Sequence, residues 1–322
     1  MNVITATVGR FDAFQKKHPV IGFPLAVFIK FGDDQAGYQA ALITYYAFVS
    51  LFPLLLVGFS LIPLLVRNNP DLQQRIIAAT VDYFPVIGQD LAHNIHAYHG
   101  HGWALAAGML FILYGARGIA NVLQDASNDI WQVVRTKRAG FPFNLLRSIG
   151  IISVGGIGLI ATTVTMGFVT GISRSGVPSK ILLGLLTLFL NTLVFLIVAR
   201  LATAGVIVTK KLWIGAVFAA LFWQILQVAG GVLVWHQVRG TSTLYGTFAV
   251  VLGLLFWLYL QAQFYIYALE IAVVRHNKLW PRNIIQPPFN EADRKVYAGY
   301  AKTERRKKEE LVLVEFSKKT KV

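Results

Sequence analysis

Polar side chains that could act together inside a membrane occur in the stretch Trp103–Trp131 and directly after it. Six of them recur at spacings of three and four: Arg117, Asn121, Gln124, Asp125, Asn128 and Gln132. On a helix this spacing places them on about a third of the circumference. The residues before Arg117 are uncharged and apolar, so the helix would begin in lipid and continue as an amphipathic rod. Arg117 would then lie at or just inside the membrane boundary, where ionisable side chains are candidates for contact with a solute or ion.

Two other apolar segments carry polar faces of the same kind. Near the end of the last apolar segment, Tyr259, Gln263, Tyr267 and Glu270 share one face at helical spacing. In the first apolar segment, Pro53 lacks a backbone donor and is predicted to kink the helix. The predicted cavity and pathway residues are Tyr46, Ser50, Arg117, Asn121, Asp125, Gln263, Tyr267 and Glu270.

These stripes predict a polar cavity that opens to the cytoplasm. We expect Arg117 and Glu270 to approach each other or to line one cavity there, because opposite charges in lipid are costly unless paired. The alternative is that the polar side chains only hydrogen-bond neighbouring helices and line nothing.

The sequence carries no recognisable catalytic or metal-binding motif. There is no P-loop, G-x-S-x-G or H-E-x-x-H, and there are no cysteines. His99 and His101 form H-x-H, but Trp103–Ala104 stand where a metal nuclease would need Asp–His. Together with His93 and His96 these histidines could suit zinc, copper or nickel, but no carboxylate lies among them, which favours a polar loop. We therefore predict no enzyme activity, no cofactor and no metal site.

The elements that would position these residues are membrane-spanning helices. Hydrophobic residues make up 55% of the 322 residues and charged residues only 14%, whereas about a quarter of a soluble domain is charged. Several uncharged runs exceed the roughly 18 residues that indicate a transmembrane helix. The fold class is therefore predicted to be all-α, a polytopic membrane protein with six transmembrane helices. The predicted spans are about 40–65, 102–123, 148–171, 181–199, 212–235 and 244–269.

The two terminal segments differ from the region of spans. Residues 1–39 mix basic and aromatic residues, and the short apolar run Pro24–Phe31 predicts an interfacial helix. Asp33 and Asp34 are predicted to cap the first span. Residues 275–322 form a basic tail, in which we expect a helix near Glu291–Glu310 followed by a frayed or disordered end.

The distribution of Lys and Arg predicts the topology. With six spans, both termini lie on one side. Of the 30 Lys and Arg residues, all fall on that side except Arg67, Arg75, Arg174, Lys180 and Arg239. The positive-inside rule therefore predicts N-in, C-in. The net charge of +15 indicates attraction to anionic lipid headgroups, chiefly at the tail, and no nucleic-acid partner.

Three blocks resemble the YihY/BrkB family of inner-membrane proteins. They are Ala41–Ala47 with Ser50–Leu55, then Arg117-Gly118 with Asn128-x-Ile130-Trp131, and finally Leu244–Gly246 with Trp257–Leu260 and Glu270. The resemblance covers about residues 20–275. Thr44 and Ile271 depart from the familiar pattern, and the segment Ala199–Thr209 lacks an expected proline. The resemblance implies a multi-pass protein of the bacterial inner membrane, and it implies no established activity, although the family was formerly labelled ribonuclease BN-like.

Three functions follow as expectations. The first is transport or export of a small solute or ion through the polar cavity. The alternative is a non-transporting scaffold or assembly protein of the envelope, and a membrane-bound ribonuclease is the least favoured.

Overall fold

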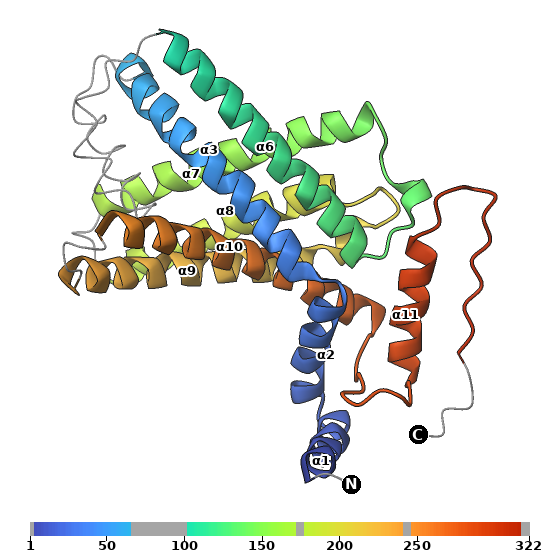
Figure 1. The fold of residues 1–322 in the computed structure, drawn as a ribbon. Coiled ribbons are helices and arrows are strands. Elements are labelled where there is room, and N and C mark those ends of the chain that lie inside the picture. Colours follow the sequence, from blue (N-terminus) through green and yellow to red (C-terminus); the bar gives the residue numbers. More distant parts are fainter. Residues whose placement is uncertain (1–2, 66–101, 172–176, 241–245, 317–322) are drawn as a thin grey trace.

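The computed structural model describes residues 3–65, 102–171, 177–240 and 246–316 (Figure 1). Within these ranges every regular element is a helix, as the all-α prediction requires. The helices are α1 (Val3–Lys17), α2 (Pro19–Asp33), α3 (Ala36–Leu65), α6 (Gly102–Ile130), α7 (Phe143–Gly171), α8 (Val177–Ala202), α9 (Trp213–Gly240), α10 (Gly246–Asn277) and α11 (Glu291–Thr303), with short 3-10 turns at Arg135–Lys137 and Thr209–Lys211.

Four stretches of the described chain are long and apolar enough to cross a membrane. They are Ala106–Ile130, Phe143–Thr162, Ile181–Ala202 and Val251–Asn277. Helix α9 adds a shorter apolar stretch, Trp213–Gln227. Helices α3 and α9 are 30 and 28 residues long, against the roughly 20 residues that a span needs. The protein is therefore an all-helical membrane protein, and the count of six spans stays a prediction.

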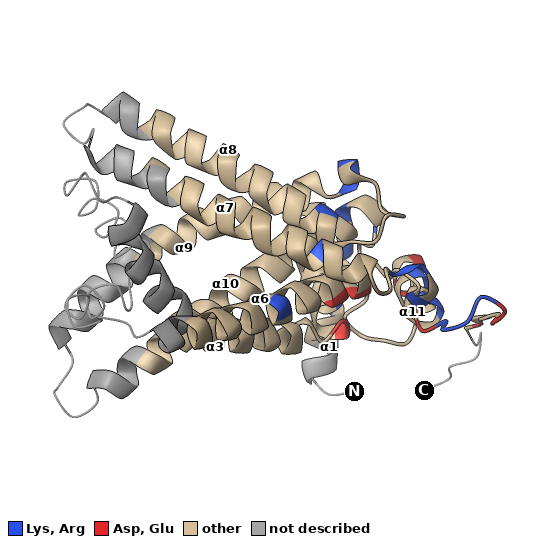
Figure 2. Cartoon of the chain, turned by 90° about the horizontal axis from the view of Figure 1, so that it is seen from above, with Lys and Arg blue, Asp and Glu red and all other residues tan. Residues whose placement is uncertain are grey.

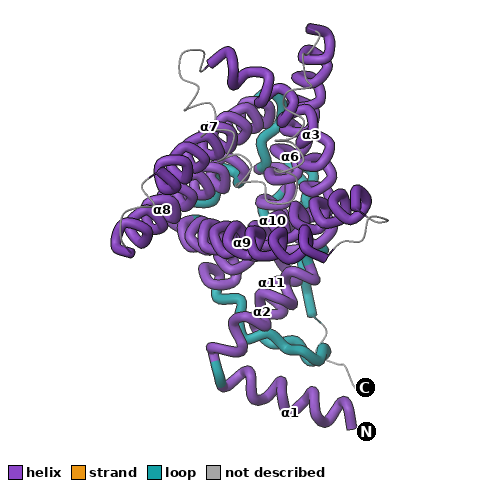
Figure 3. The backbone as a smooth tube through the Cα atoms, turned by 90° about the vertical axis from the view of Figure 1, so that its left-hand side faces the viewer, coloured by secondary structure: helices purple, strands orange, loops and turns teal. Residues whose placement is uncertain are grey.

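The six long helices pack as pairs. Helix α3 lies along α6, α7 along α8, and α9 along α10. Seen end-on, α3 and α6 occupy one side of the bundle and α7 and α8 the other (Figure 3). Glycines permit the closest approaches. A Cβ on Gly118 of α6 would overlap the Tyr46 ring of α3, and one on Gly215 of α9 would lie 2.9 Å from the Ala268 carbonyl oxygen of α10.

Helix α6 ends at Ile130, two residues before the last member of the stripe of polar residues, Gln132. Gln132 follows its last residue, Ile130, with a φ of 52°, a left-handed conformation that stops a helix. The Gln132 side chain then donates a 3.0 Å hydrogen bond to the Val296 carbonyl in α11. The residue that follows the end of α6 is thus hydrogen-bonded to a residue 164 positions later in the sequence.

The terminal segments fold together at one end of the bundle, where both ends of the chain lie (Figure 1). We call α1, α2, α11 and the linker of residues 278–290 the terminal unit. Helix α2 extends beyond the predicted run Pro24–Phe31 and buries Gly22, Ala26, Val27 and Lys30. The predicted tail helix exists as α11, which begins with a capping box between Asn290 and Asp293.

One expectation about the terminal segments is wrong. Asp33 and Asp34 do not act as simple caps, because their side chains form ion pairs with Arg282 and Lys30. The described tail also packs outside its helix, because Arg282 is fully buried and the Phe316 ring packs 5.8 Å from that of Phe289. The predicted surface helix and histidine cluster of the loop 67–101 lie outside the described residues.

Candidate functional site

A cavity of about 460 Å³ lies among the six long helices. Each of α3, α6, α7, α8, α9 and α10 contributes side chains to its wall, and most of them are apolar. Polar residues in the lining are Ser50, Thr162, Asn191, Gln261 and Tyr265. A partly open, largely apolar cavity lined by all six long helices differs from the polar cavity that the stripes predict.

Two hydroxyl groups of the lining are hydrogen-bonded to the backbone of their own helices and so add little polarity to the cavity. Ser50 donates to the Tyr46 carbonyl of its own helix at 2.9 Å, and Thr162 donates to the Gly158 carbonyl at 2.9 Å. Such i to i−4 bonds turn a hydroxyl back towards its own backbone. Of the eight predicted pathway residues, Ser50 is the one that lines this cavity.

Arg117 lies between α6 and α7. It donates to the Ser148 hydroxyl and, at 3.3 Å, to the Asn144 side chain. Gln124 also donates to the Ser148 hydroxyl, at 2.8 Å, and that hydroxyl donates to the Asn121 side chain at 3.4 Å. Because Ser148 is fully buried, this cluster works as a polar contact between two helices, as the alternative interpretation of the stripes expects.

Two partners in this cluster were not predicted as site residues. Asn144 and Ser148 are four residues apart at the beginning of α7, which is the spacing that places them on one helix face. That spacing could have identified them. Asp125 is solvent-exposed and joins neither the cluster nor the cavity lining.

Glu270 lies in a different cluster from Arg117. Its carboxyl group is 3.1 Å from the Lys30 ammonium group, and both side chains are fully buried. Arg117 faces α7 whereas Glu270 faces α2, so the predicted direct approach of the two does not occur. The other predicted residues of α10 contact neighbours of their own: Gln263 donates to the Tyr259 hydroxyl at 3.1 Å, and the Tyr267 ring stacks on Phe31 with centroids 4.0 Å apart. The kink at Pro53 stays a prediction, and α3 continues as a helix to Leu65.

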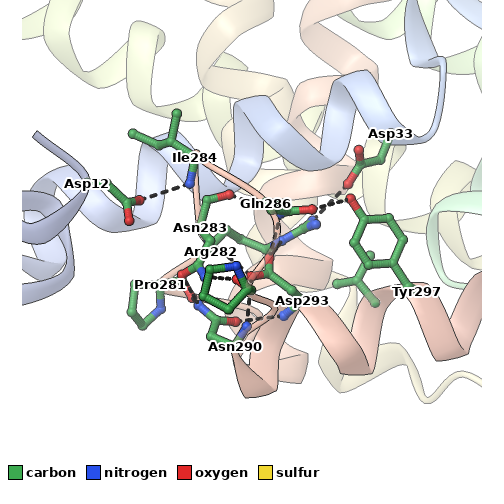
Figure 4. A network of polar contacts seen from close by, with 12 residues as sticks. Asp12, Asp33, Pro281, Arg282, Asn283, Ile284, Gln286, Asn290, Asp293 and Tyr297 are labelled. Carbon is green, nitrogen blue, oxygen red and sulfur yellow. Dashed lines mark hydrogen bonds and ion pairs between the residues drawn. The ribbon is translucent and has the colours of Figure 1, made fainter. Parts of the chain in front are cut away.

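The terminal unit contains a second buried ionic cluster, shown in Figure 4. Arg282 lies 3.0 Å from Asp33 of α2 and 2.6 Å from Asp293 of α11. Burial works against the charge on Arg282, but Asp293 and Asp33 outweigh that effect and raise its pKa. Arg282 therefore remains a cation and joins α2 to α11.

Further contacts extend this cluster to α1. The Ile284 amide donates to Asp12 at 2.9 Å, and Gln15 donates to the Arg282 carbonyl at 2.7 Å. Gln15 is fully buried. The linker after α10 is thereby fixed against the N-terminal helix (Figure 4).

The sequence patterns did not identify Lys30 and Arg282 as buried. Lys30 is a single cation within the apolar run Pro24–Phe31, and that isolation was the available signal. Burial alone would lower its pKa, but Glu270 and Asp34 raise it. Arg282 lies among the many basic residues of the tail, so nothing in the local sequence distinguishes it.

Comparison with known families matches residues 27–291 to the family described as Virulence factor BrkB. The chain belongs to the BrkB family. The match covers most of the chain, in agreement with the resemblance of the three sequence blocks. In this BrkB-family chain the matched residues include Arg117, Lys30, Glu270 and Arg282, whereas α1 and most of α11, with Asp293, lie outside them.

Curated relatives of this BrkB-family chain are described as membrane proteins. A UPF0761 membrane protein of Pseudomonas paraeruginosa is 24% identical over 286 residues, which cover 85% of this chain and 68% of the relative. One from Pseudomonas aeruginosa is 24% identical over 263 residues, or 79% of this chain, and the chain spans only 62% of its length. One from Pseudoalteromonas translucida is 23% identical over 270 residues, covering 81% and 87%. No solved structure matches the chain.

Proposed function

We propose that this BrkB-family protein spans the bacterial inner membrane six times and transports a small solute with a largely apolar body. The spans would be α3, α6, α7, α8, α9 and α10, with both termini in the cytoplasm. Two observations support this orientation. The terminal unit brings both ends of the chain to one end of the bundle (Figure 1). Lysines and arginines of the described chain gather at that same end (Figure 2), as the positive-inside rule requires of a cytoplasmic side.

The cavity among the six helices carries the transport proposal. The space is partly open and all six long helices line it, so a small molecule could enter between them. A space of about 460 Å³ is within the range of small-molecule sites. Its position between the α3–α6 pair and the α7–α8 pair would allow the two pairs to move relative to each other.

The chemistry of the lining selects the class of solute. An inorganic ion would lose its hydration shell in this cavity, and the largely apolar wall offers few oxygen or nitrogen atoms in compensation. An apolar surface instead gains about 25 cal/mol for each Å² removed from water. The asparagine and glutamine at positions 191 and 261 could orient one polar group of a solute.

A variant that fills the cavity tests this proposal. Gly155 lines the cavity, and no atom lies within 4 Å of an added Cβ. Gly155→Phe should therefore occupy the chamber without disturbing its neighbours. The matched control is Ile157→Phe on the same helix, because Ile157 is 68% exposed and lies outside the cavity lining.

The measurement is charge movement in proteoliposomes on a solid-supported membrane. The panel contains chloride, sodium, protons and naphthalene-2-sulfonate, an organic anion with an apolar body. We expect a current with naphthalene-2-sulfonate that Gly155→Phe abolishes and Ile157→Phe retains. A current driven by inorganic ions alone, or equal loss in both variants, would contradict the proposal.

A scaffold role is the second candidate, and the basic segment that follows α11 favours it. In its run Arg305–Lys308 the last three residues are exposed. They would attract anionic lipid headgroups, with about 1 kcal/mol from each basic residue near the surface. Deletion of residues 304–322 separates the two functions. Transport should survive the deletion, whereas binding to liposomes that contain phosphatidylglycerol should weaken and an assembly role should be lost.

A further inference from the structure

Three charged side chains meet where α2, α3 and α10 join. They are Lys30 and Asp34 at the end of α2 and Glu270 near the end of α10. Their side chains are 0%, 2% and 0% exposed. Lys30 forms an ion pair with Asp34, lies 3.1 Å from Glu270 and donates a 3.1 Å hydrogen bond to the carbonyl of Ile130 at the end of α6. The three protons of the ammonium group therefore have three acceptors.

The two carboxyl groups lie against the same cation. Lys30 forms an ion pair with Asp34 and another with Glu270, so a single ammonium group serves both carboxyl groups. Apart from the ion pair with Lys30, neither oxygen of Glu270 accepts a hydrogen bond from the described residues. A carboxylate can only accept, and it becomes a donor when it is protonated. Two buried carboxyl groups that share one cation repel each other unless one of them carries a proton.

The charge of the cluster leads to the same conclusion. Two carboxylates and one ammonium group leave an excess negative charge in a place closed to water, which is costly. Arg282 of the linker does not supply the missing charge, because it is paired with two carboxylates of its own, those of Asp33 and Asp293.

Among the described residues, no ion pair other than those with Lys30 includes Asp34 or Glu270. Helix α11 contributes the Tyr300 hydroxyl beside Asp34, α10 contributes the Tyr267 phenol near Glu270, and α6 contributes the carbonyl of its last residue. Helix α3 begins two residues after Asp34 and offers only the partial charge of a helix N-terminus. No three His, Asp or Glu side chains of the described chain form a group that could hold a metal ion.

We propose that Asp34 and Glu270 together bind one proton beside Lys30, and that this proton site joins α2 to α10 and α6. The proton neutralises the excess charge and lets one carboxyl group donate to the other. Its release leaves a second negative charge in the dry junction, which weakens the packing of α2 on α10. The site is separate from the apolar cavity, whose lining contains none of the three residues, so it does not depend on the transport proposal.

Infrared spectroscopy of the full-length protein in lipid nanodiscs tests the proposal, because a protonated carboxyl group has a C=O stretching band that a carboxylate lacks. We expect this band at neutral pH, with an intensity equal to one carboxyl group per protein, and its loss when the pH is raised. Glu270→Gln and Asp34→Asn should each remove it. Asp129→Asn should leave it, because Asp129 is 37% exposed and paired with Arg138.

A second variant tests the role of Lys30. In Lys30→Met the two carboxyl groups lose their cation, so both should take up a proton and the band should double. Absence of the band in the unmodified protein at neutral pH would overturn the proposal, and so would a band that persists unchanged in both carboxyl variants. The titration of the unmodified protein decides the question even where a variant does not fold.

Discussion

Arg282 is the residue with the largest expected effect on the terminal unit. It is fully buried between Asp33 and Asp293, 3.0 Å and 2.6 Å away. Arg282→Met would leave two buried carboxylates without their cation, and breaking a buried pair in this way costs about 3–5 kcal/mol. We expect a lower thermal unfolding midpoint and faster proteolysis after residue 278. The control is Lys302→Met, an exposed position on α11, and an equal effect of both variants would contradict the role of Arg282.

The pH dependence of the contact between α1 and the linker follows from Asp12. Burial alone would raise the pKa of Asp12, but hydrogen bonds from the Ile284 amide, Lys16 and Gln15 outweigh it and lower the pKa below 3.8. A carboxyl group with a lowered folded-state pKa contributes stability above its unfolded pKa, and this contribution is lost as the pH falls through the folded value.

The variant Asp12→Asn tests the predicted loss of stability at low pH. The variant should be less stable than the unmodified protein at pH 6 by about 1 kcal/mol, the scale of one hydrogen bond, and the difference should disappear towards pH 2. Thermal unfolding midpoints across this pH range measure it. A difference that grows on acidification would show that the sign is wrong.

At the scale of elements, hydrophobic runs predicted where the long helices lie but not where they end. The predicted span 148–171 corresponds to α7, which begins five residues earlier, at Phe143. The predicted span 244–269 corresponds to α10, which ends eight residues later, at Asn277. Runs of apolar residues stop where charges begin, whereas a helix can continue as long as its backbone bonds are met. Helix α10 continues past Glu270 to Asn277. The carboxyl group of Glu270 pairs with Lys30 of α2, and a partner 240 residues away in sequence is not visible in a local pattern.

The pairing of α3 with α6 depends on Gly118. A Cβ at this position would overlap the Tyr46 ring, so Gly118→Ala should force the two helices apart. Overpacking of this kind costs about 1–3 kcal/mol. Removal of the ring should restore the space, and we therefore expect Gly118→Ala combined with Tyr46→Ala to unfold at a higher temperature than Gly118→Ala alone. Gly9→Ala is the control, because nothing lies within 4 Å of its added Cβ.

At the scale of the whole molecule, the contact between the two termini could not be predicted from sequence. The bonds from Gln15 to the Arg282 carbonyl and from the Ile284 amide to Asp12 join residues 267 and 272 positions apart. Periodicity describes one helix at a time and charge counts describe only sides of the membrane. The predicted number of spans and the charge distribution placed the termini on the same side of the membrane. Neither of them predicts that Asp33 and Arg282 are in contact.

This contact makes the orientation of the molecule testable. The chain has no cysteine, so single cysteines can be introduced without background and labelled with a maleimide that does not cross membranes. Arg10→Cys on α1 and Lys302→Cys on α11 are exposed positions, and with N-in, C-in topology both should react only after the inner membrane is permeabilised. Arg75→Cys, in the loop predicted to lie outside, should react in intact spheroplasts.

The two terminal cysteines separate an error of orientation from an error of fold. If all three positions behave in the reverse way, the molecule is inserted upside down, and only the positive-inside argument is wrong. If Arg10→Cys and Lys302→Cys react from opposite sides, α1 and α11 cannot belong to one unit, and the ion pairs of Arg282 with Asp33 and Asp293 cannot form together. The same labelling experiment therefore tests the topology and the terminal unit independently, because each predicts a different pattern across the three positions.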